Sequence, residues 1–225
     1  MEAGKAMINI VYEDNHLLVA EKPVNIPVQK DSSNDDDFLN ILKRYLKEKY
    51  HKPGNVYLGL VHRLDRPVGG IMVFAKTSKA ASRLSKQVMD RTLKKTYIAV
   101  VKGNIKSKGV FTDKLLKDKK KNIVKVNDKG KEAKLNYEKL DYKDNLSLVK
   151  INLETGRSHQ IRVQFSSRGY PLLGDQKYGK DMPKIPIALF AEKLEFTHPI
   201  TKEKLTFTLP LPDRYPFNIF ENKKK

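Results

Sequence analysis

The chain has no cysteine, no long apolar run and comparatively few acidic residues. Without cysteine it has no disulfide framework, no thiolate metal site and no cysteine nucleophile. No apolar stretch approaches the roughly 18–20 residues that a membrane-spanning helix needs, and the first residues lack the apolar core of a secretory signal. We therefore expect a cytoplasmic protein without a membrane partner. Its 225 residues are enough for one large domain or two small ones.

Positive charge dominates the composition. The sequence has 45 Lys and Arg residues against 26 Asp and Glu residues, a formal net charge of +19. A field of this sign attracts polyanions and releases counterions when they bind. A lysine-rich genome would produce a similar excess, but nucleic acid is the partner that this balance favours.

Hydrophobic periodicity predicts the elements of the first half. Strands are expected at residues 8–12, 17–20, 56–60, 71–75 and 96–101, where short apolar runs stand between turn-forming residues. A helix is expected from Phe38, because apolar residues recur there at helical spacing. The acidic residues Asp35, Asp36 and Asp37 are interpreted as its N-terminal cap rather than as a metal site. Thr77 or Ser78 caps a second helix that runs to Arg91.

A lysine-rich segment follows at residues 114–134. It holds nine lysines and three acidic residues, and its alternation around Asp128, Lys129 and Gly130 predicts a hairpin that turns there. Such a hairpin is either a solvated edge, where lysines discourage aggregation, or an arm that grips phosphates. The residues alone leave both interpretations open.

The second half adds more strands than helices. Strands are expected at 146–153, 187–196 and 204–209, and one helix is expected after residue 157, ending at Gly169. Strands are often consecutive, which predicts an α+β fold with a largely antiparallel sheet. We expect a basic tail at residues 220–225.

Charged residues interrupt two apolar runs in the stretch LGLVHRLDRPVGGIMVFAKT, residues 58–77. Asp65 stands between Arg63 and Arg66, so it should stay ionised and serve as a nucleophile, a weak base or an electrostatic stabiliser. A structural Asp–Arg pair at a strand turn is the alternative. Gly69 and Gly70 would leave space for a ring or a phosphate close to the backbone. No metal-ligand spacing accompanies His62, so neither a metal nor a cofactor is expected.

A second group of polar residues lies in LETGRSHQIRVQF, residues 153–165. A helix that began near Ser158 would favour an anion at its N-terminus, next to Arg157. Arg162 lies one turn further on, between apolar residues. A buried arginine needs a carboxylate partner, and Asp65 is the natural candidate. His159 is more typical of a hydrogen-bonded structural histidine than of a catalytic base.

These two stretches together resemble the RluA-type pseudouridine synthases, whose motifs read approximately H-R-L-D-x-x-T-S-G and L-x-T-G-R-x-H-Q-I-R. The segments IVYEDNHLLVAEKPVNIPV, KKTYIAVVKG and ALFAEKLEFTHPIT also match, in family order, over roughly residues 8–212. The resemblance implies a single catalytic domain over residues 1–225, with a core at about 8–212. Its central sheet would be bent and mostly antiparallel, with flanking helices and an active-site cleft. No N-terminal S4-type RNA-binding domain is expected.

The resemblance also implies an activity, the isomerisation of uridine in RNA to pseudouridine without a cofactor or a metal. Asp65 matches the catalytic aspartate, Tyr97 the tyrosine that stacks on the base, and Arg162 the arginine paired with the aspartate. Whether the aspartate attacks ribose C1′, attacks uracil C6 or removes the 2′ proton is left open. The flipped base and its RNA would be held by a further set of residues: His62, Arg63, Arg157, Gln160 and Leu189.

The match has two departures. Val68 and Gly69 replace the family's Thr-Ser, and Phe190 stands where a histidine is common. Neither removes a group that the chemistry needs. We expect structured RNA as the partner, ribosomal RNA before transfer RNA, bound by a monomer with no obligate protein partner. The alternatives are a catalytically silent RNA-binding protein on the same fold and a metal-dependent nuclease, which would need more carboxylates than Asp65.

Overall fold

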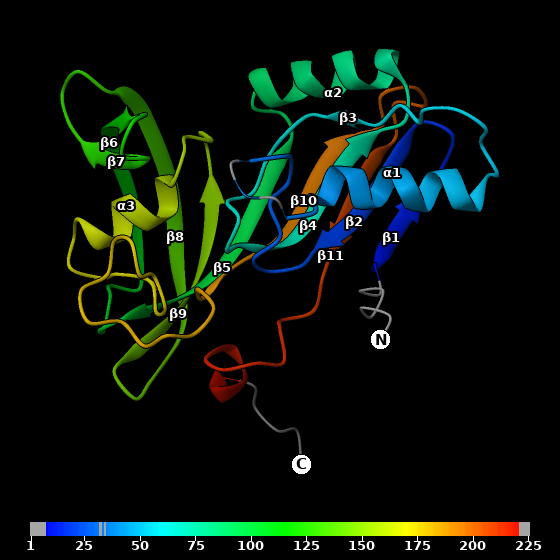
Figure 1. The fold of residues 1–225 in the computed structure, drawn as a ribbon. Coiled ribbons are helices and arrows are strands. Elements are labelled where there is room, and N and C mark those ends of the chain that lie inside the picture. The colour runs from blue at the N-terminus through cyan, green and yellow to red at the C-terminus, as the bar shows by residue number, and fades with distance from the viewer. Residues whose placement is uncertain (1–7, 32, 34, 221–225) are drawn as a thin grey trace. The chain divides into compact units, whose positions relative to one another are not determined.

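The computed structural model describes residues 8–31, 33 and 35–220. The chain groups into two compact units, residues 1–93 with 194–208, and residues 94–193 with 209–225. Helices and antiparallel strands in both units confirm the predicted α+β class (Figure 1). The single catalytic domain stays a prediction. Most of the basic tail lies outside the described residues.

The first unit is a sheet with two helices. Its elements in chain order are β1 Ile10–Glu13, β2 Leu17–Lys22, α1 Phe38–Lys49, β3 Gly59–Leu60, β4 Gly69–Ala75, α2 Ser78–Met89 and β11 Lys204–Thr208. The sheet order is β1-β2-β4-β10, with β3 paired to β4 and β11 to β10. Strand β10, Leu189–Thr197, contributes its residues from 194 onward to this unit.

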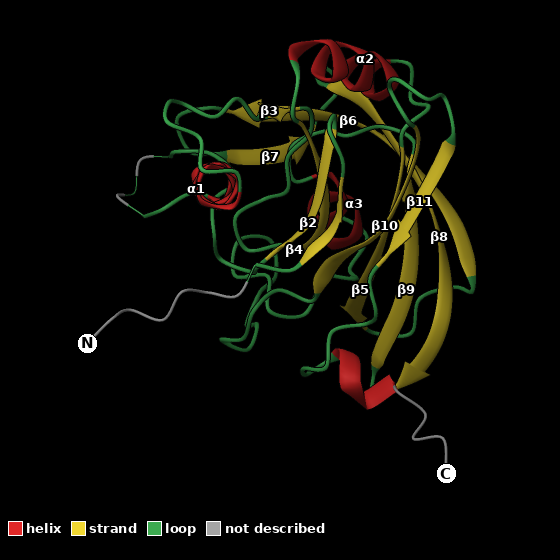
Figure 2. Cartoon of the chain, turned by 90° about the vertical axis from the view of Figure 1, so that its right-hand side faces the viewer, coloured by secondary structure: helices red, strands yellow, loops and turns green. Residues whose placement is uncertain are grey.

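Burial explains why these segments take these forms. All seven residues of β4 are buried, as a near-continuous apolar run predicts for a strand covered on both faces. Helix α1 buries Phe38, Leu42 and Leu46 on one side, the spacing of a single helical face. Phe38 packs edge-on against Phe74 of β4, so α1 covers this face of the sheet, as Figure 2 shows.

The second unit is a curved set of antiparallel strands with one helix. Its elements are β5 Lys94–Lys102, β6 Lys108–Asp118, β7 Ile123–Val126, β8 Lys131–Lys143, β9 Leu146–Leu153, α3 Gln160–Ser166, the first part of β10 and the 3₁₀ helix η1 Phe217–Phe220. The strand order is β10-β5-β9-β8-β6-β7. Phe165 of α3 packs against Phe111 and Tyr137 of the strands, which anchors α3 on the sheet.

The prediction of a hairpin that turns at Asp128, Lys129 and Gly130 is wrong about which strands pair. The chain does turn there, because the amide of Gly130 donates to the carbonyl of Asn127 at 2.8 Å. However, β7 and β8 both pair with β6 rather than with each other. The true hairpin is β6–β7, and residues 119–122 form its turn.

Two smaller expectations also change. The strand predicted at 56–60 is only Gly59–Leu60. Only Asp37 caps α1, where its side chain accepts a hydrogen bond from the amide of Asn40 at 3.0 Å. Asp36 instead pairs with Arg44, and Asp35 with Arg66. The cap of α2 is Thr77, as predicted. In the part of the chain that the structure describes, no helix is both long and apolar enough to span a bilayer.

Candidate active site

Asp65 lies in the loop between β3 and β4, in the first unit. The loop is tightened by a turn in which the amide of Val68 donates to the carbonyl of Asp65 at 2.9 Å. Leu64 and Val68 are buried on either side, while Asp65 itself is only partly buried. The apolar neighbours therefore fix the loop and leave the carboxylate at the surface of the unit.

His62 precedes Asp65 and holds the loop to the next strand. It is buried, and its Nε2 accepts a hydrogen bond from the amide of Val73 at 3.1 Å. Arg63 is exposed. Of the two residues predicted to contact substrate here, Arg63 has a side chain in solvent, and His62 has a role in the fold.

Lys22 is a buried cation under this loop that the sequence analysis missed. Its side chain is fully buried, and Nζ donates to the carbonyls of Pro23, Ile26 and Arg66 at 2.8, 2.7 and 3.1 Å. Burial lowers the pKa of Lys22 to about 7, an effect that the Asp65 carboxylate opposes and Arg66 reinforces. The signal in the sequence was a lysine at the end of an apolar strand, directly before a proline.

The geometry of the backbone favours glycine at both positions after the loop. A Cβ on Gly69 would lie 3.1 Å from Val24 Cγ1 and 3.2 Å from the carbonyl oxygen of Lys22. Gly70 has a φ of 127°, which L side chains rarely adopt. The expectation that both leave room for a ring or phosphate is therefore corrected at Gly69, where Val24 and the carbonyl of Lys22 occupy that space.

Arg66 faces an acidic loop. Its guanidinium bonds the carboxylates of Asp31 and Asp35 and, at 2.9 Å, the hydroxyl of Ser33. These bonds keep the pKa of Asp35 below its usual value. Two of the acidic residues in the loop before α1 are thus partners of the arginine that follows Asp65.

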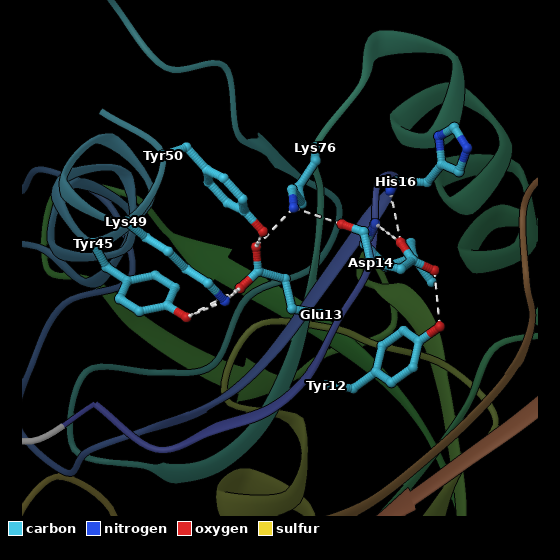
Figure 3. Close-up of polar contacts among 9 residues, drawn as sticks. Tyr12, Glu13, Asp14, His16, Tyr45, Lys49, Tyr50 and Lys76 are labelled. Atoms are coloured by element: carbon cyan, nitrogen blue, oxygen red, sulfur yellow. Dashed lines mark hydrogen bonds and ion pairs between the residues drawn. The ribbon is translucent and has the colours of Figure 1, made fainter. Parts of the chain in front are cut away.

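Figure 3 shows a second polar cluster of the first unit, around Glu13 at the end of β1. The Glu13 carboxylate accepts hydrogen bonds from Lys49, Lys76, Tyr45 and Tyr50, at 2.6–3.0 Å. Burial alone would raise the pKa of Glu13, but these four donors lower it to about 2. The cluster joins β1 to α1 and to the end of β4, and it leaves no carboxylate oxygen of Glu13 without a donor.

The other predicted catalytic residues belong to the second unit. Tyr97 is buried on β5, opposite Ile151 of β9. Leu189 is buried at the start of β10. Arg162 is buried on α3, as its apolar neighbours in the sequence predicted.

Arg162 has a carboxylate partner that the sequence analysis missed. Nε and Nη2 donate to the two carboxylate oxygens of Asp175 at 2.8 and 2.7 Å. The predicted pairing of Arg162 with Asp65 stays a prediction. Asp175 stands in LLGDQKYG, and only its position after a glycine in a polar loop could have drawn attention to it.

Gln160 and Arg157 shape the turn before α3. The Gln160 side chain is buried, and its Oε1 accepts from the hydroxyl of Thr155 at 2.8 Å and the amide of Arg157 at 3.0 Å. Nε of Arg157 donates to the carbonyl of Glu132 at 2.8 Å, while the residue is exposed. Helix α3 begins at Gln160 and has seven residues, later than the start near Ser158 that was predicted.

Exposed lysines gather on the strands next to α3. The segment 114–134 spans the end of β6, β7 and the start of β8. Eight of its nine lysines are exposed: Lys114, Lys117, Lys119, Lys120, Lys121, Lys125, Lys129 and Lys131. The segment therefore presents a positive surface whatever its partner is. Within residues 8–31, 33 and 35–220, no three His, Cys, Asp or Glu side chains form a group that could hold a metal ion.

The chain is similar in sequence to known RNA pseudouridylate synthases. The sequence profile of the family described as RNA pseudouridylate synthase matches residues 16–167. Ribosomal large subunit pseudouridine synthase D of Nitrosomonas europaea is 35% identical, over 94% of this chain and 64% of the relative. The protein of the same name from Haemophilus influenzae is 34% identical, over 95% of this chain and 70% of the relative. The chain thus spans somewhat less than two thirds of the length of the first relative and slightly more than two thirds of the length of the second.

Solved structures show the same fold. Human RNA Pseudouridylate Synthase Domain Containing 4 superposes with a TM-score of 0.77 and 23% identity, over 91% of this chain and 89% of that one. Human RNA Pseudouridylate Synthase Domain Containing 1 gives a TM-score of 0.74 and 24% identity, over 93% and 86%. The predicted fold is confirmed by these two structures.

Proposed function

Because this chain belongs to the RNA pseudouridylate synthase family, we propose that it converts uridine in large-subunit ribosomal RNA to pseudouridine. The N1–C1′ glycosidic bond breaks, the base turns, and a C5–C1′ bond forms. The proton on C5 passes to solvent and N1 gains a proton. No oxidant, reductant or co-substrate is needed, because substrate and product are isomers.

Asp65 carries the proposal. It lies in the sequence HRLD, inside the matched region, on a loop that Lys22, His62 and buried apolar residues hold in place. A catalytic group needs this kind of rigid support. An ionised carboxylate there would serve as nucleophile or base toward the ribose or the uracil. Tyr97 would stack on the flipped base, and Arg162 would stabilise the charge of Asp65; both also lie in the matched region.

Substrate contacts fall to a smaller set than the sequence suggested. The exposed guanidiniums of Arg63 and Arg157 suit phosphate oxygens. Leu189 offers an apolar wall to a base. His62 and Gln160 bond to the backbone of their own units, so in the proposal they shape the site around the substrate.

The lysine surface of residues 114–134 supports an RNA substrate. Ammonium groups on a hairpin reach phosphates without reading sequence, and they displace condensed counterions. The hydroxyl of Ser158, beside Arg157, accepts a hydrogen bond from Lys117 at 3.3 Å. This bond connects the hairpin to the turn before α3, so phosphate contacts on the two would support one another.

Relatives named for the ribosomal large subunit favour ribosomal RNA over transfer RNA as the substrate. They come from bacteria, where ribosomal RNA is made in the cytoplasm, and we infer the same location for this chain. A monomer stays our expectation for its oligomeric state. A silent RNA-binding protein is the second candidate, because Val68 and Gly69 replace the Thr-Ser of the family motif next to Asp65.

Tritium release tests the proposal in vitro. Large-subunit ribosomal RNA transcribed with 5-tritiated uridine loses tritium to water only where C5 exchanges its hydrogen for C1′. We expect release by the purified chain and none by Asp65→Ala, while both retain the RNA on a filter. Equal retention without release by either protein would favour the silent RNA-binding protein.

A further inference from the structure

The carboxylate of Asp175, which pairs with Arg162, is also held by backbone amides of its own turn. Oδ1 accepts hydrogen bonds from the amides of Lys177 and Tyr178 at 3.0 and 3.2 Å. The turn begins at Gly174, whose φ of 78° and close approach to the carbonyl of Ile185 exclude a side chain. Asp175 is therefore fixed by backbone groups, and its side chain is 1% exposed.

This carboxylate fixes one edge of the Arg162 guanidinium. The two parallel hydrogen bonds use Nε and Nη2, and such a bidentate geometry sets both the position and the plane of the group. The guanidinium carbon lies over the Tyr178 ring, 5.1 Å from its centre.

Tyr178 is held in turn by its hydroxyl group. That oxygen accepts a hydrogen bond from the amide of Val124 at 2.9 Å and lies 2.6 Å from His159 Nδ1. The same short turn thus supplies a bidentate ion pair and a cation–π contact to Arg162. Together they restrict a long side chain that would otherwise have several rotamers.

We propose that Asp175 is a positioning residue for Arg162, and that catalysis depends on it through Arg162 alone. The inference rests on the proposed function, in which Arg162 acts at the reaction centre. An arginine displaced by about 1 Å would still carry its charge but would lose most of its value in the transition state. RNA affinity would be unaffected, because Asp175 is buried and has the wrong sign to contact phosphate.

The test compares Asp175→Asn with wild type by single-turnover tritium release, using transcribed large-subunit ribosomal RNA. We expect the maximal rate to fall about tenfold to a hundredfold, with the RNA concentration for half-maximal rate unchanged. Asp175→Asn combined with Arg162→Lys should be no slower than Arg162→Lys alone, because a residue that acts through Arg162 has no effect once Arg162 is altered.

The chain offers a matched control. Asp113 forms a bidentate pair with Arg168, at 2.9 and 3.1 Å, in the same unit. Asp113→Asn removes the same charge from the same kind of pair and should keep the wild-type rate. If Asp175→Asn fails to fold, as judged by thermal unfolding, Asp175→Glu replaces it; the longer carboxylate keeps the charge but moves the guanidinium, so the same loss is expected.

Three results would overturn the inference: a folded Asp175 variant with the wild-type rate, a loss that multiplies with that of Arg162→Lys, or a loss confined to RNA affinity. Failure of the proposed function looks different, because wild-type protein would then release no tritium at all.

Discussion

Lys22 donates a hydrogen bond to the carbonyl of Arg66, the residue directly after Asp65, at 3.1 Å. The bond crosses from the end of β2 to the proposed catalytic loop. Its donor is an ammonium group with no exposed surface, whose other two hydrogen bonds satisfy carbonyls of its own segment. The loop is thus tied to the sheet by a charged group that the fold has removed from water.

This arrangement predicts an unusual dependence of stability on pH. With a pKa of about 7 in the folded chain and 10.5 when unfolded, Lys22 binds fewer protons folded than unfolded between these values. The free energy of unfolding should therefore rise with pH over this window, by about 2 kcal/mol between pH 7 and pH 9 from this group. Urea unfolding of wild type and Lys22→Met across this range measures the difference. Parallel profiles would show that the ammonium stays charged in the folded chain.

Glu13 predicts a dependence of the same sign at acid pH, where the free energy of unfolding again rises with pH. Its folded pKa of about 2 lies below the ordinary 4.5, so its contribution is complete above pH 4.5 and is lost as the pH falls toward 2. Wild type should lose about 2 kcal/mol from this group by pH 3. Glu13→Gln should be less stable than wild type at pH 7. Its free energy of unfolding, measured with denaturant, should also change less between pH 6 and pH 3. Equal losses in both proteins would mean that the four donors do not hold the carboxylate ionised.

The turn of the β6–β7 hairpin predicts how RNA affinity responds to salt. Replacing Lys119, Lys120 and Lys121 by glutamine should weaken RNA binding and reduce the slope of log affinity against log salt by about 2, if each lysine meets a phosphate. Filter binding between about 50 and about 200 mM salt would measure this slope. The control removes the same charge elsewhere, at Lys79, Lys106 and Lys204. The same slope change in both triple variants would mean that net charge, and not this turn, binds RNA.

Local patterns predicted the elements well because they record burial directly. The seven apolar residues of β4 and the helical spacing from Phe38 to Leu46 each have one plausible structure. Strand pairing is harder to predict than the elements themselves, because the alternating lysines in β7 and β8 do not indicate which strand lies between these two. Strand β6 takes that place, and no periodicity records it.

The site shows the same limit. Asp65, Tyr97 and Arg162 were found because they stand in recognisable motifs. Asp175 was not, because its pairing with Arg162 spans 13 residues and depends on a turn that backbone amides build. Lys22 was missed because a buried lysine is indistinguishable in sequence from the many exposed ones in a chain with a net charge of +19.

The most direct test of the proposed catalytic role of Asp65 is pseudouridine mapping of total RNA from cells that lack this gene, complemented with wild type or with Asp65→Ala. Ribosomal RNA sites should vanish on deletion and return only with wild type, since loss of the central catalytic group costs at least about a thousandfold in rate. Sites that return with Asp65→Ala, or that never change on deletion, would contradict that role.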